Sequence, residues 1–274
     1  MHLGKSHGPG RFFGQMLDPA IPSAVRVVRC NSADLTVADH DRIAGFITRY
    51  SLYDRKTLDA TLDAATYVWL CLDSKGRIVG STAVRRVQLA AGVGGHGRPV
   101  TVVYTSVVAV NASYRRLGLP AKMGLKTYLF ERWRAPLTPL YWLAEAVSPA
   151  GYLQMARNFD VFWPQPAVRV PADANAIVDA TLATAGATRI KFVGDARLVY
   201  EDYPVIEREQ APDRWDRSDP AVDFFLRTNP DYWTGSALVC LTPLNIVAVA
   251  KAVTGVFLKV LIRKRSGART PAGP

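Results

Sequence analysis

The chain of 274 residues is long enough for one large domain, or for one ordinary domain with an extension. Apolar residues make up 49% of it and charged residues 21%, a balance that allows a packed core and excludes global disorder. The formal net charge of +11 favours anionic partners, of which four classes fit: nucleic acid, anionic lipid, an acidic carrier protein or a phosphorylated cofactor.

The ends and the cysteines of the chain indicate its compartment. Residues 1–24 are rich in His, Lys, Arg and Gly and lack the apolar run of a secretory signal, so we expect a flexible basic arm. Cys30, Cys71 and Cys240 are far apart, and each lies in an apolar run. Their number and spacing suit neither a disulfide framework nor a metal site. We therefore expect reduced, buried thiols, no metal, and a cytoplasmic location.

The first half of the chain alternates between β-branched runs and stretches with apolar residues at helical spacing. The turn sequence at 73–76 ends in Gly and predicts a hairpin between the strands on either side of it. The elements expected here are strands at 25–30, 66–72, 78–89 and 100–110, with helices at 37–50 and 54–65.

A helix at 119–133 and a strand at 141–147 should follow, and Pro120 suits the first turn of that helix. Ser148 is a candidate N-cap for another helix that ends near residue 159. A strand, helix and strand in succession form a parallel crossover, whereas the hairpin is antiparallel. The expected fold class is therefore α/β of the α+β type, with a mixed central sheet flanked by helices.

We expect the first domain to cover residues 25–163 and an extension to cover 164–235. Within that extension the pattern predicts a helix and a strand, then a linker rich in proline and charge, and then a turn packed by aromatic residues. These elements are expected at 170–186, 189–199, 201–223 and 224–235, in that order.

The last segment, 236–274, has an unusual composition. No charge occurs from 236 to 250, and Lys251, Lys259 and Arg263 then follow at intervals that give one narrow polar stripe on a helix. We expect an apolar or amphipathic C-terminal helix with a basic end. Three placements stay open: docked on the core, lying in a membrane interface, or spanning a bilayer.

The run that follows the 100–110 strand resembles the cofactor-binding motif of the GNAT superfamily of acyltransferases. That motif is Arg or Gln, two residues, Gly, one residue, then Gly or Ala, between a strand and a helix. Arg115 and Gly118 match it, and Pro120 replaces the last Gly or Ala. The resemblance spans about half of the chain and implies a GNAT-like sheet that binds an acyl-CoA or the phosphopantetheine of an acyl carrier protein.

The physical basis of such a motif is a cluster of main-chain N–H groups at the positive end of a helix, where a pyrophosphate binds. A glycine lets the phosphate approach the backbone, and arginines add charge. Pro120 removes one N–H from this cluster. The residues expected to hold the phosphates are Arg115, Arg116, Leu117, Gly118, Leu119 and Ala121.

The resemblance also implies that the strand before this motif contains a bulge and pairs with the pantetheine arm through its main chain, at Val108 and Val110. The next strand is expected to diverge from it, with the thioester in the gap. Glu145 is the carboxylate of that next strand, and it is our candidate general base, with a structural carboxylate as the alternative. Tyr152 is the candidate general acid, with a packing residue as the alternative.

His96 lies in a glycine-rich connector. We expect it to be mobile and exposed to solvent, with a role as a base or an acceptor-binding group as the alternative.

The function expected from these residues is transfer of an acyl group from acyl-CoA or acyl carrier protein to a primary amine such as an amino acid. A long acyl chain is favoured over acetyl, because a basic chain with an apolar extension resembles the bacterial long-chain N-acyl amino acid synthases. Basic runs without interleaved aromatic residues argue against nucleic acid. The alternative is a non-catalytic module that binds the same donors at an anionic membrane surface, peripheral on the inner membrane face.

Overall fold

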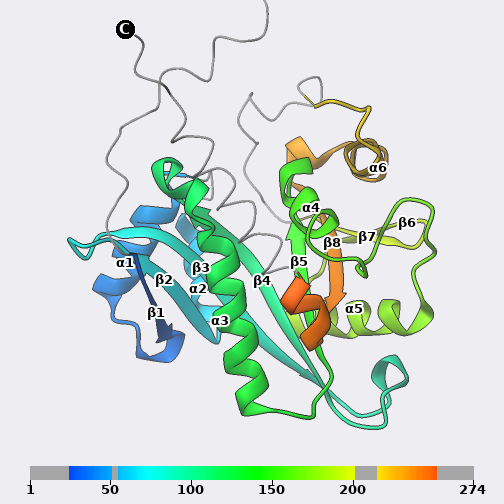
Figure 1. The fold of residues 1–274 in the computed structure, drawn as a ribbon, viewed down its shortest axis with the longest axis horizontal. Coiled ribbons are helices and arrows are strands. Elements are labelled where there is room, and N and C mark those ends of the chain that lie inside the picture. The colour runs from blue at the N-terminus through cyan, green and yellow to red at the C-terminus, as the bar shows by residue number, and fades with distance from the viewer. Residues whose placement is uncertain (1–24, 51–54, 201–214, 252–274) are drawn as a thin grey trace, which may run out of the picture.

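The computed structural model describes residues 25–50, 55–200 and 215–251. The eight strands that it names form one sheet in the order β1-β2-β3-β4-β5-β8-β7-β6 (Figure 1). Their bounds are Arg26–Asn31, Tyr67–Leu72, Ile78–Leu89, Val100–Val110, Leu140–Ala146, Ile190–Val193, Ala196–Tyr200 and Ser236–Pro243 for β1 to β8. Only the β4–β5 pair is parallel among these strands, so the sheet is mixed, as expected.

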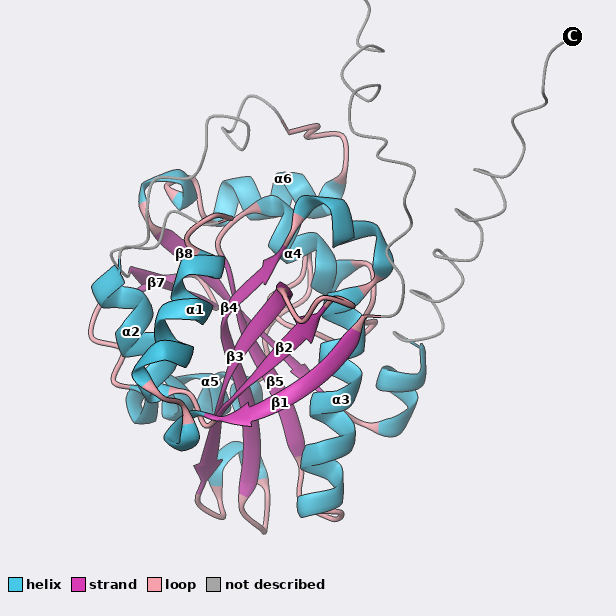
Figure 2. Ribbon diagram, turned by 90° about the vertical axis from the view of Figure 1, so that its left-hand side faces the viewer, coloured by secondary structure: helices cyan, strands magenta, loops and turns pink. Residues whose placement is uncertain are grey.

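Helices cover both faces of this sheet. Their bounds are Val37–Ile47, Arg55–Ala64, Leu119–Arg134, Pro149–Ala156, Ala172–Ala185 and Pro220–Thr228 for α1 to α6. Apolar side chains of α1, α2 and α5 pack on one face, and those of α3, α4 and α6 on the other. Figure 2 shows α1 and α2 on one side of the sheet and α3 on the other.

The local signals of the first half are confirmed. Gly76 takes a φ of 71° in the β2–β3 hairpin, a conformation that costs glycine little. Pro120 lies in the first turn of α3. Ser148 caps α4, because its Oγ accepts a hydrogen bond from the N–H of Gly151 at 3.4 Å.

The expected C-terminal helix is wrong for its first eight residues. Residues Ser236–Pro243 form β8, which lies between β5 and β7 inside the sheet. Side chains such as Val239 and Cys240 are buried on opposite faces. A strand buried on both faces shows no polar alternation, so its uncharged sequence looks like that of a buried helix. A helical stretch runs from 246 to 251, and residues 252–274 lie outside the described residues.

Strand β8 also joins the expected extension to the first domain. Trp163 and Leu241 exchange main-chain hydrogen bonds of 2.8 Å in both directions, and β8 pairs with β5. The sheet therefore continues across the boundary expected at residue 163. The expected strand at 189–199 is a hairpin of two strands, β6 and β7, and the expected aromatic turn at 224–235 begins inside α6.

Within the three described ranges, no helix combines the length and the apolar character that crossing a bilayer demands. Most of the expected C-terminal helix, residues 252–274, lies outside those ranges.

A buried ion pair attaches α3 to the sheet. Glu131 of α3 has a fully buried side chain, and it accepts hydrogen bonds from Arg86 Nε at 2.8 Å and from the Tyr67 hydroxyl at 2.9 Å. Burial, followed by the nearby Glu131 charge, raises the pKa of Tyr67, so this phenol stays a donor. Arg86 belongs to β3 and Tyr67 to β2, so these contacts fix the position of α3 relative to two strands of the sheet.

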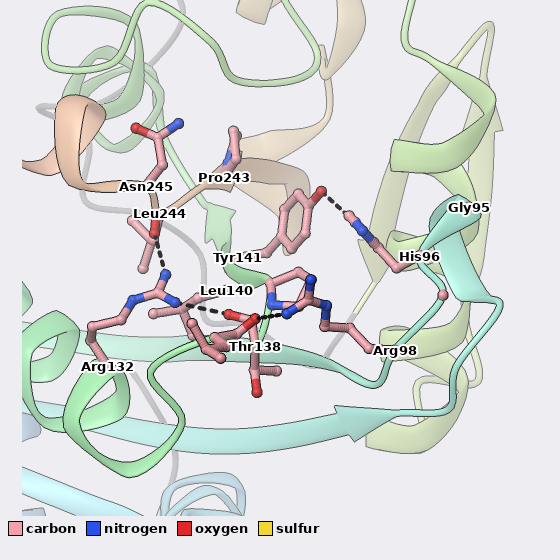
Figure 3. Close-up of a pocket in the computed structure, with 13 residues that line it drawn as sticks. Gly95, His96, Arg98, Arg132, Thr138, Leu140, Tyr141, Pro243, Leu244 and Asn245 are labelled. Carbon is pink, nitrogen blue, oxygen red and sulfur yellow. Dashed lines mark hydrogen bonds between the residues drawn. The ribbon is translucent and has the colours of Figure 1, made fainter.

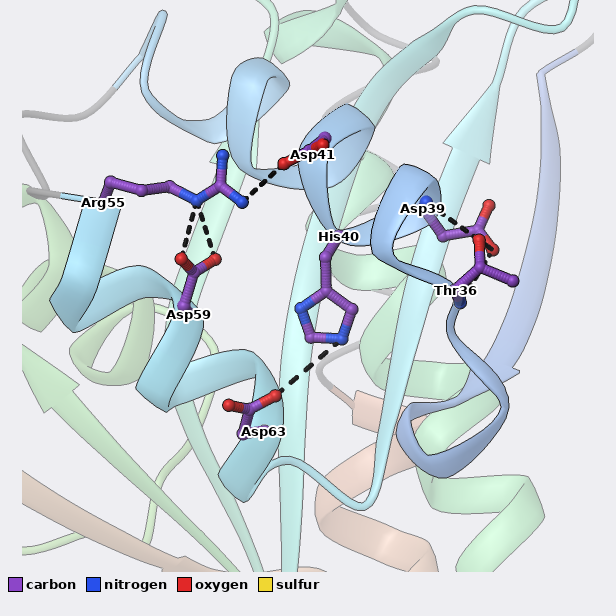
Figure 4. Close-up of polar contacts among 7 residues, drawn as sticks. All are labelled: Thr36, Asp39, His40, Asp41, Arg55, Asp59 and Asp63. Atoms are coloured by element: carbon purple, nitrogen blue, oxygen red, sulfur yellow. Dashed lines mark hydrogen bonds and ion pairs between the residues drawn. The ribbon is translucent and has the colours of Figure 1, made fainter.

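We predict that Arg86→Leu lowers the free energy of unfolding by about 3 kcal/mol, because it leaves the Glu131 carboxylate buried without a counter-charge. Urea denaturation followed by circular dichroism measures this loss. The control is Arg55→Leu, since Arg55 joins Asp41 and Asp59 at the surface of α1 and α2 (Figure 4). A loss as small as the control's would contradict the anchoring role of Glu131.

Candidate functional site

Strands β4 and β5 separate at their carboxyl ends. Their parallel pairing runs from Thr101 opposite Leu140 to Thr105 opposite Ala144 and goes no further. Beyond that point β4 stays paired with β3 as far as Val110, and β5 stays paired with β8 as far as Ala146. We call this opening, between residues 106–110 of β4 and 145–146 of β5, the fork.

A β-bulge accounts for the separation. On β3, Ala83 lies opposite Val107 and the next residue, Val84, lies opposite Thr105, so residue 106 is an extra residue of β4. A bulge bends its strand and increases the local twist. Val108, just beyond it, has a 52% exposed side chain although β4 is a central strand. The fork is therefore open to solvent.

The main chain of β4 offers hydrogen-bonding groups to the fork. The N–H of Asn111 donates to the carbonyl of Val79 on β3 at 3.0 Å. Main-chain groups point to alternate sides along an antiparallel strand. The N–H and C=O groups of Val108 and Val110 therefore point away from β3, toward the fork. Groups exposed in this way can pair with an extended ligand as a neighbouring strand would.

A side-chain contact closes the base of the fork on the α3 side. Trp142 Nε1 of β5 donates to Thr105 Oγ1 of β4 at 2.8 Å, and Thr105 is the last residue of β4 that pairs with β5. The Trp142 ring also packs on Phe159, with ring centroids 5.6 Å apart. This contact fixes where the separation begins.

Glu145, the candidate base, lies on the other side of the fork. It is partly buried, and its carboxylate accepts a hydrogen bond from the buried Tyr104 hydroxyl. Strand register accounts for this contact, because Tyr104 lies opposite Leu143 in the parallel pair and Glu145, two residues beyond Leu143, points to the same face.

The turn between β4 and α3 provides the second part of the site. A 3-10 helix, η3 at Ala112–Leu117, leads to Gly118, which has φ 66° and ψ 29° and starts α3. The Asn111 side chain accepts from the N–H of Ser113 at 3.0 Å. Arg115 is exposed, whereas Leu119 is fully buried.

Of the residues expected to hold phosphate at this turn, Leu119 can therefore contribute only its main chain. The side chain of Arg116 is outside the described part of the structure. Leu117 and Ala121 are partly buried beside the turn.

Tyr152, the candidate general acid, lies in the core. Its side chain is fully buried, and its hydroxyl donates to the carbonyl of Pro164 at 2.9 Å. The rings of Phe162, Phe224 and Phe225 surround it. Burial raises the pKa of Tyr152. This placement supports the packing alternative, so we do not propose Tyr152 as a proton donor.

The three thiols are poor nucleophiles. Burial raises the pKa of Cys71 to about 11 and also raises that of Cys240. The pKa of Cys30 is raised by burial and then by the charge of Asp39. Thiolate is the reactive form, so these shifts suppress covalent chemistry. Among the described residues, no group of three His, Cys, Asp or Glu side chains could hold a metal ion.

No protein-family model matches the chain, and no curated protein matches it. Solved structures do match. One is a GNAT family N-acetyltransferase from Escherichia coli in complex with CoA, with 17% identity, 48% of this chain and 68% of that chain covered, and a TM-score of 0.36. Another is the ribosomal-protein-alanine N-acetyltransferase from Brucella melitensis biovar Abortus 2308, with 17% identity, 54% and 100% coverage, and a TM-score of 0.38.

A third is an aminoglycoside acetyltransferase from an uncultured soil metagenomic sample in complex with sisomicin, with 18% identity, 54% and 92% coverage, and a TM-score of 0.36. Similarities at this level carry no functional argument. The function therefore rests on the geometry of the fork and of the turn.

We predict that the native protein reacts slowly with Ellman's reagent at pH 8, because its thiols are buried and protonated. Denaturation should release all three equivalents, and only the partly exposed Cys30 should contribute before it. The control is the Cys30→Ser variant, which should show almost no reaction until denatured. A fast native reaction in this variant would contradict the burial of Cys71 and Cys240.

Proposed function

We propose that this chain is a GNAT-type N-acyltransferase, which moves an acyl group from a thioester to a primary amine. The observation that carries the proposal is the fork, whose exposed main-chain edge ends at a glycine turn bearing Arg115. A pantetheine thioester needs both parts: an extended edge for its amides and a cationic helix start for its phosphates.

The donor is proposed to lie along β4. Its pantetheine amides would pair with the main-chain groups of Val108 and Val110, which face the fork. Its phosphates would meet Gly118, which has no Cβ to obstruct them, and the exposed Arg115. Arg116, Leu117, Leu119 and Ala121 complete the proposed turn. Pro120 supplies no N–H, so the first turn of α3 offers one contact fewer.

Glu145 is proposed as the general base. As the amine attacks the thioester carbonyl, its nitrogen loses a proton to Glu145, the C–S bond breaks, and the thiolate leaves and takes up a proton. Tyr104 donates to the same carboxylate and so orients it. It is a positioning residue in this scheme.

The donor and acceptor classes are proposals at a finer level. The net charge of +11 favours an acidic donor, either CoA or the phosphopantetheine of an acyl carrier protein. The acceptor is proposed to be a small amine such as an amino acid. A long-chain preference and an association with the inner membrane face depend on an apolar tail at 236–274. Residues Ser236–Pro243 of that segment form the core strand β8. These two proposals therefore depend on residues 252–274, which lie outside the described residues.

We predict that Glu145→Gln lowers kcat by about 100-fold or more, because general-base catalysis is lost, while the Kd for the donor changes little. Steady-state release of thiol and calorimetric titration with the donor measure the two quantities. The control is Asp63→Asn, which changes a carboxylate exposed on α2. If Glu145→Gln turns over as fast as wild type, Glu145 is not the base. If wild type binds donor without turnover, the chain is the non-catalytic module.

We predict that Gly118→Ala weakens CoA binding by at least about tenfold, because a Cβ then stands where the phosphates approach and the backbone at φ 66° is strained. Calorimetric titration with CoA measures this. Gly186→Ala is the matched control, since Gly186 also has a positive φ of 77° and meets open space at the end of α5. Equal CoA affinity in the two variants would contradict the proposed phosphate site.

A further inference from the structure

A cavity lies at the opposite end of the strands that form the fork. Its volume is about 430 Å³, and its walls are the β3–β4 connector, the α3–β5 turn, the start of β5 and the end of β8 (Figure 3). Tyr141 lines it, four residues before Glu145, which is about 13 Å along an extended strand. The cavity is thus separate from the proposed reaction centre, and the proposed function leaves it unexplained.

Three glycines in the connector hold His96 at the cavity wall. Gly92, Gly94 and Gly95 have φ values of 95°, 62° and 70°, and the N–H of Gly92 donates to the carbonyl of His96 at 2.7 Å. A Cβ on Gly94 would stand 2.7 Å from Ile177 of α5, so the connector is pressed against that helix. His96 is therefore partly buried rather than exposed, whereas its expected mobility stays a prediction.

His96 and Tyr141 form a fixed polar pair at this wall. The His96 Nε2 and the Tyr141 hydroxyl lie 2.9 Å apart, and the His96 side chain points into the cavity region in Figure 3. Burial, and then the charge of Asp173 on α5, raises the pKa of Tyr141, so its hydroxyl stays protonated. The pair offers polar contacts at the cavity wall.

Two guanidinium groups reach the cavity from opposite sides of the α3–β5 turn (Figure 3). Arg98 donates to the carbonyl of Leu137 at 2.7 Å. Arg132 donates to the carbonyls of Pro136 and Thr138, both at 2.9 Å, and to that of Leu244 at 3.1 Å. Both guanidinium groups thus donate to carbonyls of the same three-residue stretch, 136–138.

The positive charges of Arg98 and Arg132 have no acidic side chain beside them in the cavity lining. In the described residues, neither Arg98 nor Arg132 forms an ion pair. The nearby Asp173 lies beside Gly95 but does not line the cavity. Neighbouring cations without a counter-charge favour an anion that can take bidentate hydrogen bonds.

The rest of the wall carries an apolar part and two further polar residues, Thr138 and Asn245. The apolar part consists of Leu137, Pro139, Leu140, Pro243 and Leu244. Leu137 has a side chain that is 79% exposed at the mouth of the cavity. A site with a few convergent polar groups on an apolar wall is typical of small-molecule pockets, and the volume lies within their usual range.

We propose that this cavity binds a small organic anion, in which a phosphate or carboxylate group meets Arg98 and Arg132 and an attached apolar group meets Pro139 and Pro243. His96 and Tyr141 close the polar side of the site. The shared chemistry is an oxyanion on an apolar body, and two probes distinguish its sources: phenyl phosphate and benzoate.

The test titrates the full chain with each probe at constant ionic strength and follows the imidazole signals by NMR. His96 should shift with saturation, whereas His40 on α1, which lies against Asp63, should not (Figure 4). The tighter probe identifies the anionic group. Inorganic phosphate should bind at least about tenfold more weakly than phenyl phosphate, because it makes no apolar contact.

Arg98→Gln should weaken the tighter probe by about tenfold or more, because one charged hydrogen-bond donor is lost. Arg98→Lys, which keeps the charge but not the planar fork, should recover part of that loss. The matched control is Arg42→Gln, since Arg42 is also exposed and donates to one backbone carbonyl, that of Gly76. Arg132 is left unchanged because it holds the α3–β5 turn.

Three results would overturn the proposal. One is the absence of a saturable shift of His96 with either probe. A second is an equal loss of affinity in Arg98→Gln and Arg42→Gln, which would indicate unspecific attraction to a basic surface. The third is competitive displacement of the probe by CoA, which would place the probe in the fork. Failure of CoA to bind at all would concern only the proposed acyl transfer.

Discussion

The extra residue at position 106 is the constraint on which the architecture of the candidate site depends. It shifts the β3–β4 register by one and bends β4, while β5 stays paired with β8. Beyond the bulge β4 stays paired with β3, whereas β5 stays paired with β8. The pairing of β4 with β5 therefore ends at Thr105, and the fork opens. An open edge in the middle of a sheet leaves main-chain groups without strand partners. A ligand of extended shape would satisfy them, and for that reason we propose the fork as the site of a pantetheine arm.

The turn after β4 can serve this edge only if α3 is held in place, and the buried Glu131 does that. It joins α3 to Arg86 and Tyr67 on two neighbouring strands. Breaking one partner of such a buried pair costs far more than breaking a surface pair. The same helix ends at the α3–β5 turn, where Arg132 donates to three carbonyls beside the cavity lined by His96 and Tyr141. One helix thus positions a cationic turn at one end of the sheet and a guanidinium at the other.

Short-range signals predicted much of this fold, and long-range pairing explains the differences. The β2–β3 hairpin, the proline in the first turn of α3 and the Ser148 cap each depend on a few adjacent residues. Strand β8 was mistaken for a helix because a strand buried on both faces lacks alternation. Glu145 could be placed on its strand from sequence, but its contact with Tyr104 depends on the register of β4 against β5. The burial of Tyr152 depends on α6, which is distant in sequence.

Binding of a thioester donor to this chain can be measured as the melting temperature of the full chain with free CoA and with a ladder of acyl-CoAs from acetyl to palmitoyl, each below its micelle concentration. A ligand that binds only the folded state must raise the melting temperature. The account predicts a rise with free CoA and a further rise with the acyl group. Growth of that rise with chain length would indicate a long-chain donor, and an equal rise would indicate a small acyl group. No rise with any member, and none with acylated carrier protein, would contradict the account.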